Sequence, residues 1–127
     1  MYEIRRKVYR RGSSHETTIP QALLLIINPD KKYNIVFKYE LEKNRWYLEF
    51  EEIGQNTEKT SPGIIKRKLY SRTGSFETTI PRTLFLTLDP EKKYYILFKR
   101  DSEINKWYIE FELSKDDNKG GVKHGKR

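Results

Sequence analysis

The chain contains the same sequence segment twice. Residues 4–51 align with residues 65–112 at a constant offset of 61 without a gap, and 27 of the 48 aligned positions are identical. Such a duplication predicts two copies of one structural unit. A unit of this size is too small to build a self-sufficient core, so we expect the two copies to bury their apolar faces against each other.

The repeat divides the 127 residues into four parts. Two modules, residues 1–52 and 65–113, flank residues 53–64, which are polar, contain Gly and Pro, and are typical of a linker. Residues 114–127 are net basic and contain few apolar side chains, so we expect a disordered basic tail.

Composition limits the classes of function. Lys and Arg number 26 against 18 Asp and Glu, and the net charge of +8 favours a polyanionic partner such as nucleic acid. Cysteine is absent, which excludes disulfides, thiolate zinc sites and a cysteine nucleophile, and favours a cytoplasmic location. No apolar stretch approaches the roughly 20 residues that span a bilayer, so we expect neither a signal peptide nor a membrane partner.

Hydrophobic periodicity and proline positions give the same element order in both modules. Alternation of apolar and polar residues indicates strands, and a proline tolerated only in the first helical turn marks the start of a short helix. The elements expected in the first module are a strand over residues 4–10, a loop over 11–15, a strand over 16–19, a helix over 21–27, and a hairpin of residues 33–38 and 46–50. In the second module the helix is expected over residues 82–88. We predict a mostly β fold with short helices, built from two β-β-α-β-β modules.

The order of these segments carries a resemblance to a known family. A short basic strand leads to ETTIP at residues 16–20 and 77–81, followed by the hairpins KKYNIVFKYELEKNRWYLEF and KKYYILFKRDSEINKWYIEF. Over residues 4–112 the chain resembles the AbrB/SpoVT swapped-hairpin DNA-binding family, and its two modules in one chain resemble the arrangement in MraZ. The resemblance implies two modules that exchange hairpins to form a small β-barrel. It also implies duplex DNA as partner, bound by basic residues of the first strand, the following loop and the helix start.

The residues themselves indicate a DNA-binding surface on the first strand of each module. By alternation, Lys7, Tyr9 and Arg11 share one face of the strand, and the second copy repeats all three identities. Cationic side chains neutralise phosphates, tyrosine hydrogen-bonds phosphate or packs on sugar, and arginine reads guanine edges. The residues expected to contact DNA are Arg6, Lys7, Tyr9, Arg10, Arg11, Arg67, Lys68, Tyr70, Arg72 and Arg82.

Structural alternatives stand beside this interpretation. In the alternative to DNA binding, the basic strand faces are ordinary solvated surface, paired across the sheet with glutamates. Glu16 and Glu77 are expected to form salt bridges at a strand edge. Trp46 and Trp107 lie on the apolar face of each hairpin and are expected to be core residues rather than base-stacking platforms. The Lys-Lys pairs after each helix are either solvated turn residues or auxiliary phosphate contacts.

Three functions remain after this comparison, and catalysis is not among them. His15 is replaced by Phe76 in the second copy, and neither a phosphate-binding glycine loop nor a nucleophile elbow is present, so we expect no enzyme, no metal and no cofactor. The first function is a DNA-binding regulator of transcription. The second is a protein-interaction module, an antitoxin or assembly component, because the helices read QALLLII and RTLFLTL and are more apolar than the family pattern. The third is an RNA or single-strand binder that uses surface tyrosines. Self-association, or exchange of modules between chains, is compatible with each.

Overall fold

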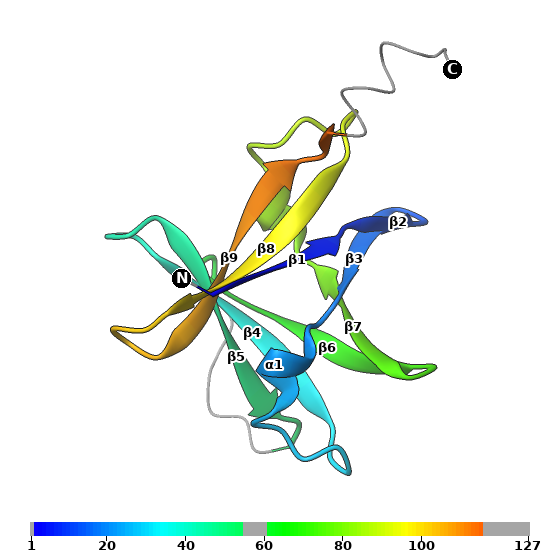
Figure 1. The fold of residues 1–127 in the computed structure, drawn as a ribbon, viewed down its shortest axis with the longest axis vertical. Coiled ribbons are helices and arrows are strands. Elements are labelled where there is room, and N and C mark those ends of the chain that lie inside the picture. Colours follow the sequence, from blue (N-terminus) through cyan, green and yellow to red (C-terminus); the bar gives the residue numbers. More distant parts are fainter. Residues whose placement is uncertain (1, 55–60, 116–127) are drawn as a thin grey trace.

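The computed structural model describes residues 2–54 and 61–115, and within them the strands form one antiparallel sheet of nine strands (Figure 1). The first module contains β1 (Glu3–Lys7), β2 (Tyr9–Arg11), β3 (Ser14–Thr18), α1 (Gln21–Leu24), β4 (Tyr33–Glu40) and β5 (Arg45–Glu52). The second module contains β6 (Ile64–Arg72), β7 (Ser75–Ile80), the 3-10 helix η1 (Arg82–Phe85), β8 (Tyr94–Asp101) and β9 (Lys106–Leu113).

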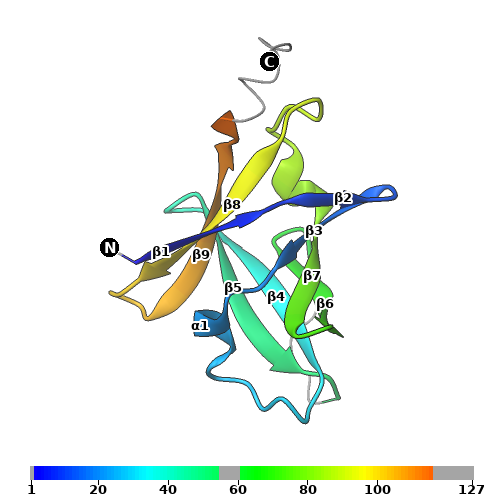
Figure 2. The ribbon, with the colours of Figure 1, turned by 45° about the vertical axis from the view of Figure 1, so that its right-hand side comes forward.

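The sheet is nearly closed into a barrel. Its strand order is β1-β8-β9-β5-β4-β6-β7-β3-β2, and only Val8 separates the two strands at the ends of this order. Figure 2 shows β1 and β2 in line, running from the β8–β9 hairpin to β3. In the second module the single strand β6 makes the same path, because residues 64–68 pair with β4 and residues 69–72 pair with β7. The predicted mostly β barrel of two modules is confirmed.

Each module places its first strand on the hairpin of the other module. β1 pairs with β8, and β6 pairs with β4, so neither first strand pairs with the hairpin of its own module. An ion pair accompanies each exchange: Arg5 Nε lies 3.0 Å from Glu112 Oε1, and Lys66 Nζ lies 3.0 Å from Glu51 Oε2. These two pairs occupy equivalent positions in the repeat. The exchange of hairpins expected for this fold is therefore present within one chain.

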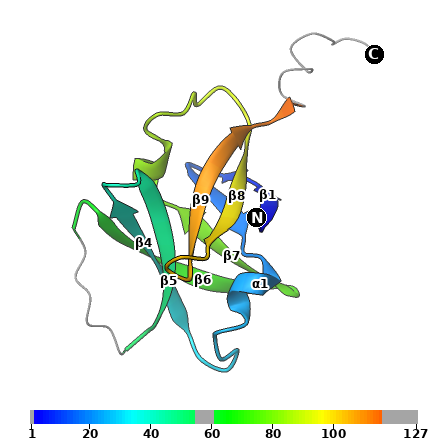
Figure 3. The ribbon, with the colours of Figure 1, turned by 60° about the vertical axis from the view of Figure 1, so that its left-hand side comes forward.

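A pseudo-two-fold axis relates the two modules. Thr17 pairs with Thr78 between β3 and β7, and Tyr47 pairs with Tyr108 between β5 and β9. Both pairs join residues separated by the repeat offset of 61, so the axis passes between their partners. The two short helices consequently lie on different sides of the barrel, as Figure 3 shows for α1 and for the turn that follows β7.

Apolar residues from both modules fill one core. The inward side chains of the hairpins, among them Ile35, Phe37, Ile96 and Phe98, are at most 2% exposed. Burying each such side chain contributes about 1.5–3 kcal/mol relative to leaving it in water. The tryptophans and the hairpin phenylalanines pack against this cluster, as expected, but are only partly buried: Trp46, Phe50, Trp107 and Phe111.

The helices are shorter than the sequence predicts. α1 ends at Leu24 instead of residue 27, and η1 ends at Phe85 instead of residue 88. Beyond α1 the backbone makes only a tight turn, in which Ile27 N–H donates to Leu24 O, and Asn28 N–H then donates to the Tyr33 hydroxyl. The residue before a proline avoids the helical conformation, and this side-chain acceptor replaces the next helical hydrogen bond. The loop expected over residues 11–15 is also shorter, because β2 extends to Arg11 and β3 begins at Ser14.

The ends of the modules show how far the packed chain extends. Ser114, the first residue of the expected tail, is 7% exposed, and its N–H donates to Lys93 O. Ile53 makes the equivalent bond to Lys32 O at the end of the first module. The rest of the expected tail, residues 116–127, and residues 55–60 of the expected linker lie outside the described residues. In residues 2–54 and 61–115 no helix has the length and apolar character needed to cross a membrane.

Candidate nucleic-acid interface

Four neighbouring strands, β6-β7-β3-β2, together with Lys7 at the end of β1, carry both of the predicted stripes on one face. In the ladder between β2 and β3, Tyr9 lies opposite Glu16, and between β6 and β7, Tyr70 lies opposite Glu77. Tyr9 and Tyr70 are 46% and 40% exposed, while the alternate residue Val8 packs on the core. The stripe face is defined here as Lys7, Tyr9, Arg11, Lys68, Tyr70 and Arg72 together with Glu16 and Glu77. The pseudo-two-fold axis passes through its centre.

Two arginines and two glutamates form an ion-pair cluster at the centre of the stripe face. Arg11 Nε lies 2.8 Å from Glu16 Oε1, and Arg72 Nε lies 3.1 Å from Glu77 Oε1. Each arginine also approaches the glutamate of the other module, at 3.9 Å and 3.8 Å. The expected salt bridges of Glu16 and Glu77 are confirmed. The charges of Arg11 and Arg72 are therefore offset inside the protein before any ligand arrives.

The outer ends of the stripe face keep free positive charge. Lys7 and Lys68 are exposed, and neither forms an ion pair with any acidic side chain of residues 2–54 or 61–115. Their backbone carbonyls accept hydrogen bonds of 2.9 Å and 2.8 Å from the buried Thr17 and Thr78 hydroxyls. These bonds fix the strand where it changes partner, so each lysine is presented from a rigid backbone. The stripe face has a neutralised centre between two cationic ends.

Arg6 and Arg67 do not belong to the stripe face, although the sequence placed them in the DNA-contacting set. They alternate with the stripe residues along β1 and β6 and are half-buried. Each donates from Nη1 to the carbonyl of the preceding residue, at 3.0 Å for Arg6 and 2.8 Å for Arg67. Their side chains therefore lie on the face of the strand opposite to the stripe residues.

Arg10 and Arg82 also lie away from the stripe face, and they meet at His15. Arg10 is the cross-strand partner of His15 between β2 and β3, and Ile80, two residues before Arg82, is its partner on β7. Burial, and then the positive charges of Arg10 and Arg82, lower the pKa of His15 from its ordinary value. His15 stacks on Phe85 with ring centroids 4.5 Å apart. No sequence pattern indicated a functional role for His15, because the second copy has Phe76 at the equivalent position.

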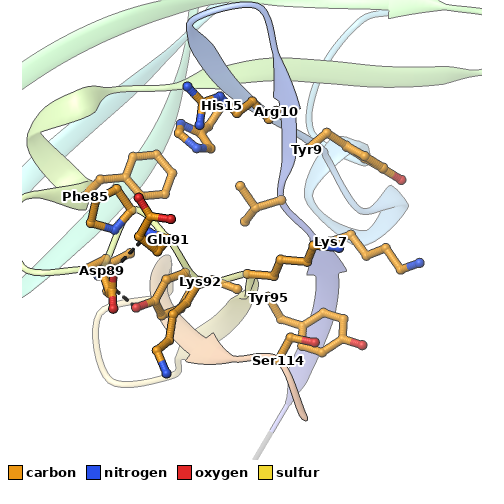
Figure 4. Close-up of a pocket in the computed structure, with 15 residues that line it drawn as sticks. Lys7, Tyr9, Arg10, His15, Phe85, Asp89, Glu91, Lys92, Tyr95 and Ser114 are labelled. Atoms are coloured by element: carbon orange, nitrogen blue, oxygen red, sulfur yellow. Dashed lines mark hydrogen bonds between the residues drawn. The ribbon is translucent and has the colours of Figure 1, made fainter. Parts of the chain in front are cut away.

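A pocket of about 580 Å³ opens beside the first stripe (Figure 4). Val8, Phe85 and Leu88 give it apolar walls, and Asp89 and Glu91 belong to the turn that follows η1. That turn is held by its own hydrogen bonds, from Glu91 N–H to Asp89 Oδ1 and from Asp89 N–H to the Tyr94 hydroxyl, each 2.9 Å. Lys92 and Lys93 also line the pocket, as does Lys7. The second Lys-Lys pair thus lies next to the stripe, and its role as an auxiliary phosphate contact stays a prediction.

The opposite side of the barrel, at β5 and β9, is a network of paired charges. Asp101 is 8% exposed and accepts hydrogen bonds from Lys43, Arg45 and the Tyr47 hydroxyl. Burial acts to raise the pKa of Asp101, but the hydrogen bonds from Lys43 and Tyr47 outweigh burial, so the pKa lies below its ordinary value. Tyr47 and Tyr108 are buried there with ring centroids 5.8 Å apart. Neither tyrosine is available to stack on a base.

Comparison with known proteins identifies no relative. No protein-family model, curated protein or solved structure matches this chain. Within the described residues no group of three or more His, Asp or Glu side chains is placed to hold a metal ion.

Proposed function

We propose that the protein binds duplex DNA through the stripe face and regulates transcription, as a tandem member of the AbrB/SpoVT family acting in the cytoplasm. One observation carries the proposal: two identical Lys-x-Tyr-x-Arg stripes, with exposed lysines and tyrosines, lie on the surface formed by β6, β7, β3, β2 and the end of β1 and are related by a pseudo-two-fold axis. Duplex DNA has its own pseudo-two-fold axes, so a surface with this symmetry presents equivalent groups to both strands.

The distribution of charge on the stripe face determines what each residue does in this proposal. Lys7 and Lys68 neutralise phosphates and release counterions, which makes the affinity depend on salt. The hydroxyls of Tyr9 and Tyr70 donate to phosphate or sugar oxygens. Arg11 and Arg72 hold Glu16 and Glu77, so their first role is to join β2 and β6 to the central strands β3 and β7.

A salt series tests the proposal. Binding of a random-sequence duplex is measured for the native chain and for Lys7→Ala/Lys68→Ala, with single-stranded DNA as competitor. Removing two phosphate contacts should lower the slope of log affinity against log salt by about 2. A control, Lys43→Ala/Lys106→Ala, removes the same charge from the β5–β9 side and should leave the slope unchanged. Equal slopes for all three chains would refute the proposal. If single-stranded DNA displaces the duplex from the native chain, the protein is instead a single-strand binder.

Exposed apolar side chains favour a second candidate function, binding to another protein. Leu25, Ile26 and Leu86, directly after the two short helices, are 81%, 78% and 74% exposed. Large apolar side chains at this exposure are typical of an interaction surface when they are contiguous, as Leu25 and Ile26 are. A second copy of the chain is the first partner to test, by sedimentation of the native chain and of Leu25→Ser/Ile26→Ser. A native dimer that the variant dissociates would support it.

A further inference from the structure

A second pocket, next to the one in Figure 4, is lined by cations without any acidic side chain. It has a volume of about 630 Å³ and lies between the β2–β3 turn, β7 and η1. Its polar lining residues are Arg10, Ser13, Ser14, His15, Arg67, Thr79 and Arg82. Asp89 and Glu91 line only the neighbouring pocket. Arg10 and His15 line both pockets and lie side by side in Figure 4.

The sheet register brings three arginines and His15 together from four elements. Arg10 on β2 pairs with His15 on β3, which pairs with Ile80 at the end of β7, and Arg82 follows at the start of η1. Arg67 comes from the neighbouring strand β6. Residues distant in the sequence, and from both modules, therefore surround one volume.

The three arginines have no carboxylate partner in the part of the chain that the structure describes. Arg10 Nε donates to Gly12 O at 3.4 Å and Arg67 Nη1 to Lys66 O at 2.8 Å, while Arg82 forms no ion pair with a described residue. Like charges that line one pocket repel each other, and an anion between them relieves that repulsion. Burial, and then the positive charges of Arg10 and Arg82, lower the pKa of His15, so the two arginines lie near enough to disfavour its charged form.

The repeat supplies an internal comparison. At the offset of 61, the positions of Arg10, His15 and Arg82 are taken by Ser71, Phe76 and Gln21 in the other half of the barrel, and only Arg67 has a cationic counterpart, Arg6. The backbone is repeated but the cation cluster is not. The cluster is thus not a requirement of the fold, because the same barrel forms its other half without it.

We propose that this pocket binds one phosphate group per chain. Arginine forks donate two parallel hydrogen bonds to phosphate oxygens, and the hydroxyls of Ser13 and Thr79 offer further donors. The phosphate belongs either to a free phosphate monoester or to a DNA backbone. If the phosphate belongs to a DNA backbone, the inference rests on the proposed function, and the two halves of the barrel then contact DNA unequally. In the free case it stands independently of DNA.

Titration with inorganic phosphate and with a nucleoside monophosphate tests the site without DNA. The readouts are the His15 imidazole shifts and the backbone amide shifts of the full chain by NMR. The variant Arg10→Ser/His15→Phe/Arg82→Gln carries the residues of the other half and should lose roughly tenfold or more in phosphate affinity, read from the amide shifts. The control Lys7→Ala/Lys68→Ala should bind phosphate as the native chain does. Measurable phosphate binding of equal affinity in the native chain and the triple variant would overturn the proposal.

A duplex arm distinguishes the source of the phosphate. If DNA supplies it, the triple variant should lower the salt slope of duplex binding by about 1, one phosphate contact, in addition to the loss from the lysine variant. If a free monoester is the ligand, only the titration responds. If the native chain does not bind duplex DNA but phosphate still saturates the site, the proposed function is wrong and this inference stands. Failure of both the titration and the slope change would overturn the inference.

The other half of the barrel allows a gain-of-function test. Gln21→Arg/Ser71→Arg/Phe76→His rebuilds the cation cluster around Arg6, and the number of phosphates bound per chain should rise from one to two. If this variant is folded and still binds one phosphate, the cluster does not make the site and the proposal is wrong.

Discussion

At the scale of single residues, buried threonines satisfy the backbone where the first strands change partner. Lys7 and Lys68 lie at the points where the chain leaves a hairpin of the other module and joins β3 or β7. Their carbonyls would lack a ladder partner there, and the hydroxyls of Thr17 and Thr78, each 1% exposed, donate to them. This requirement explains the first threonine of each ETTIP segment, which faces inward.

Removing one of these hydroxyls should destabilise the barrel. Thr78→Val keeps the shape but leaves the Lys68 carbonyl buried without a donor, which costs about 1–3 kcal/mol in the free energy of unfolding. Urea unfolding measures the loss, and Thr78→Ser should retain most of the stability. Thr18→Val, at a half-buried position, is the matched control. A Thr78→Val midpoint equal to the native one would show that the carbonyl is satisfied otherwise.

His15 gives the protein a defined pH response. Its folded pKa lies below the ordinary 6.5, so the neutral form is favoured in the folded chain. This contribution to stability is complete above pH 6.5 and is lost as the pH falls through the folded pKa. A bound phosphate favours the imidazolium form of His15 instead. Phosphate affinity should therefore rise as the pH falls through the same range. The charged residues that line the two pockets with His15 are Lys7, Arg10, Arg67, Arg82, Asp89, Glu91, Lys92 and Lys93.

NMR titration of the His15 ring checks this response. In buffer without phosphate the midpoint should lie below 6.5 and should move upward when phosphate is added. His15→Phe should remove the part of the pH dependence of phosphate binding that follows the His15 titration and leave only the part that comes from the ionisation of phosphate itself. A midpoint at or above 6.5 in phosphate-free buffer would contradict the burial and charge environment described for His15.

For single residues, the sequence pattern predicts which side chains share a strand face, but it does not predict which residues they contact. The alternation of Lys7, Tyr9 and Arg11 correctly placed them together, because the side-chain period of a strand is fixed. Arg10 was expected to contact DNA from the loop beside the stripe, whereas it lies on β2 opposite His15. The four-residue cluster of Arg11 and Arg72 with Glu16 and Glu77 depends on the pairing of β3 with β7 about the axis, which no local pattern specifies.

At the scale of elements, the central glutamates of the stripe face limit how much charge it offers to DNA. Glu16→Gln/Glu77→Gln frees Arg11 and Arg72, so duplex affinity should increase and the salt slope should steepen by up to about 2. Salt-dependent binding measures this, with Glu49→Gln/Glu110→Gln as a control of equal charge change on the β5–β9 side. Unchanged affinity in the first variant would place the DNA away from the stripe face.

The hairpins and the short helices show what an element's own sequence determines. Alternating residues predicted both hairpins, since one face of each is buried and the other is not. The predicted helices were too long. The apolar run before Asn-Pro or Asp-Pro is too short to show a helical period, so the sequence pattern does not mark where the helix ends. The partner of β1 was not determined locally, as its pattern fits either hairpin. Only the resemblance to a swapped-hairpin family indicated the exchange.

At the scale of the whole molecule, each module depends on the other for its sheet and core. The first strand of one half completes the hairpin of the other, so a single half lacks a strand partner for β1. Residues 1–54 alone should therefore fold only as a dimer, in which Glu51 takes the place of Glu112 opposite Arg5. Sedimentation and thermal unfolding at several concentrations check this, because the melting temperature of an obligate dimer rises with concentration. A folded monomer with concentration-independent melting would contradict it.

The most direct test of the central claim, that the stripe face is the DNA-binding surface, is to map a bound duplex onto the chain. Amide shifts of the full chain are recorded by NMR while a random-sequence duplex is added. We expect the shifts to concentrate on β2, β3, β6, β7 and the end of β1, around Lys7, Tyr9, Lys68 and Tyr70, in both halves. Shifts centred on β5 and β9, or none while the chain stays folded, would contradict it.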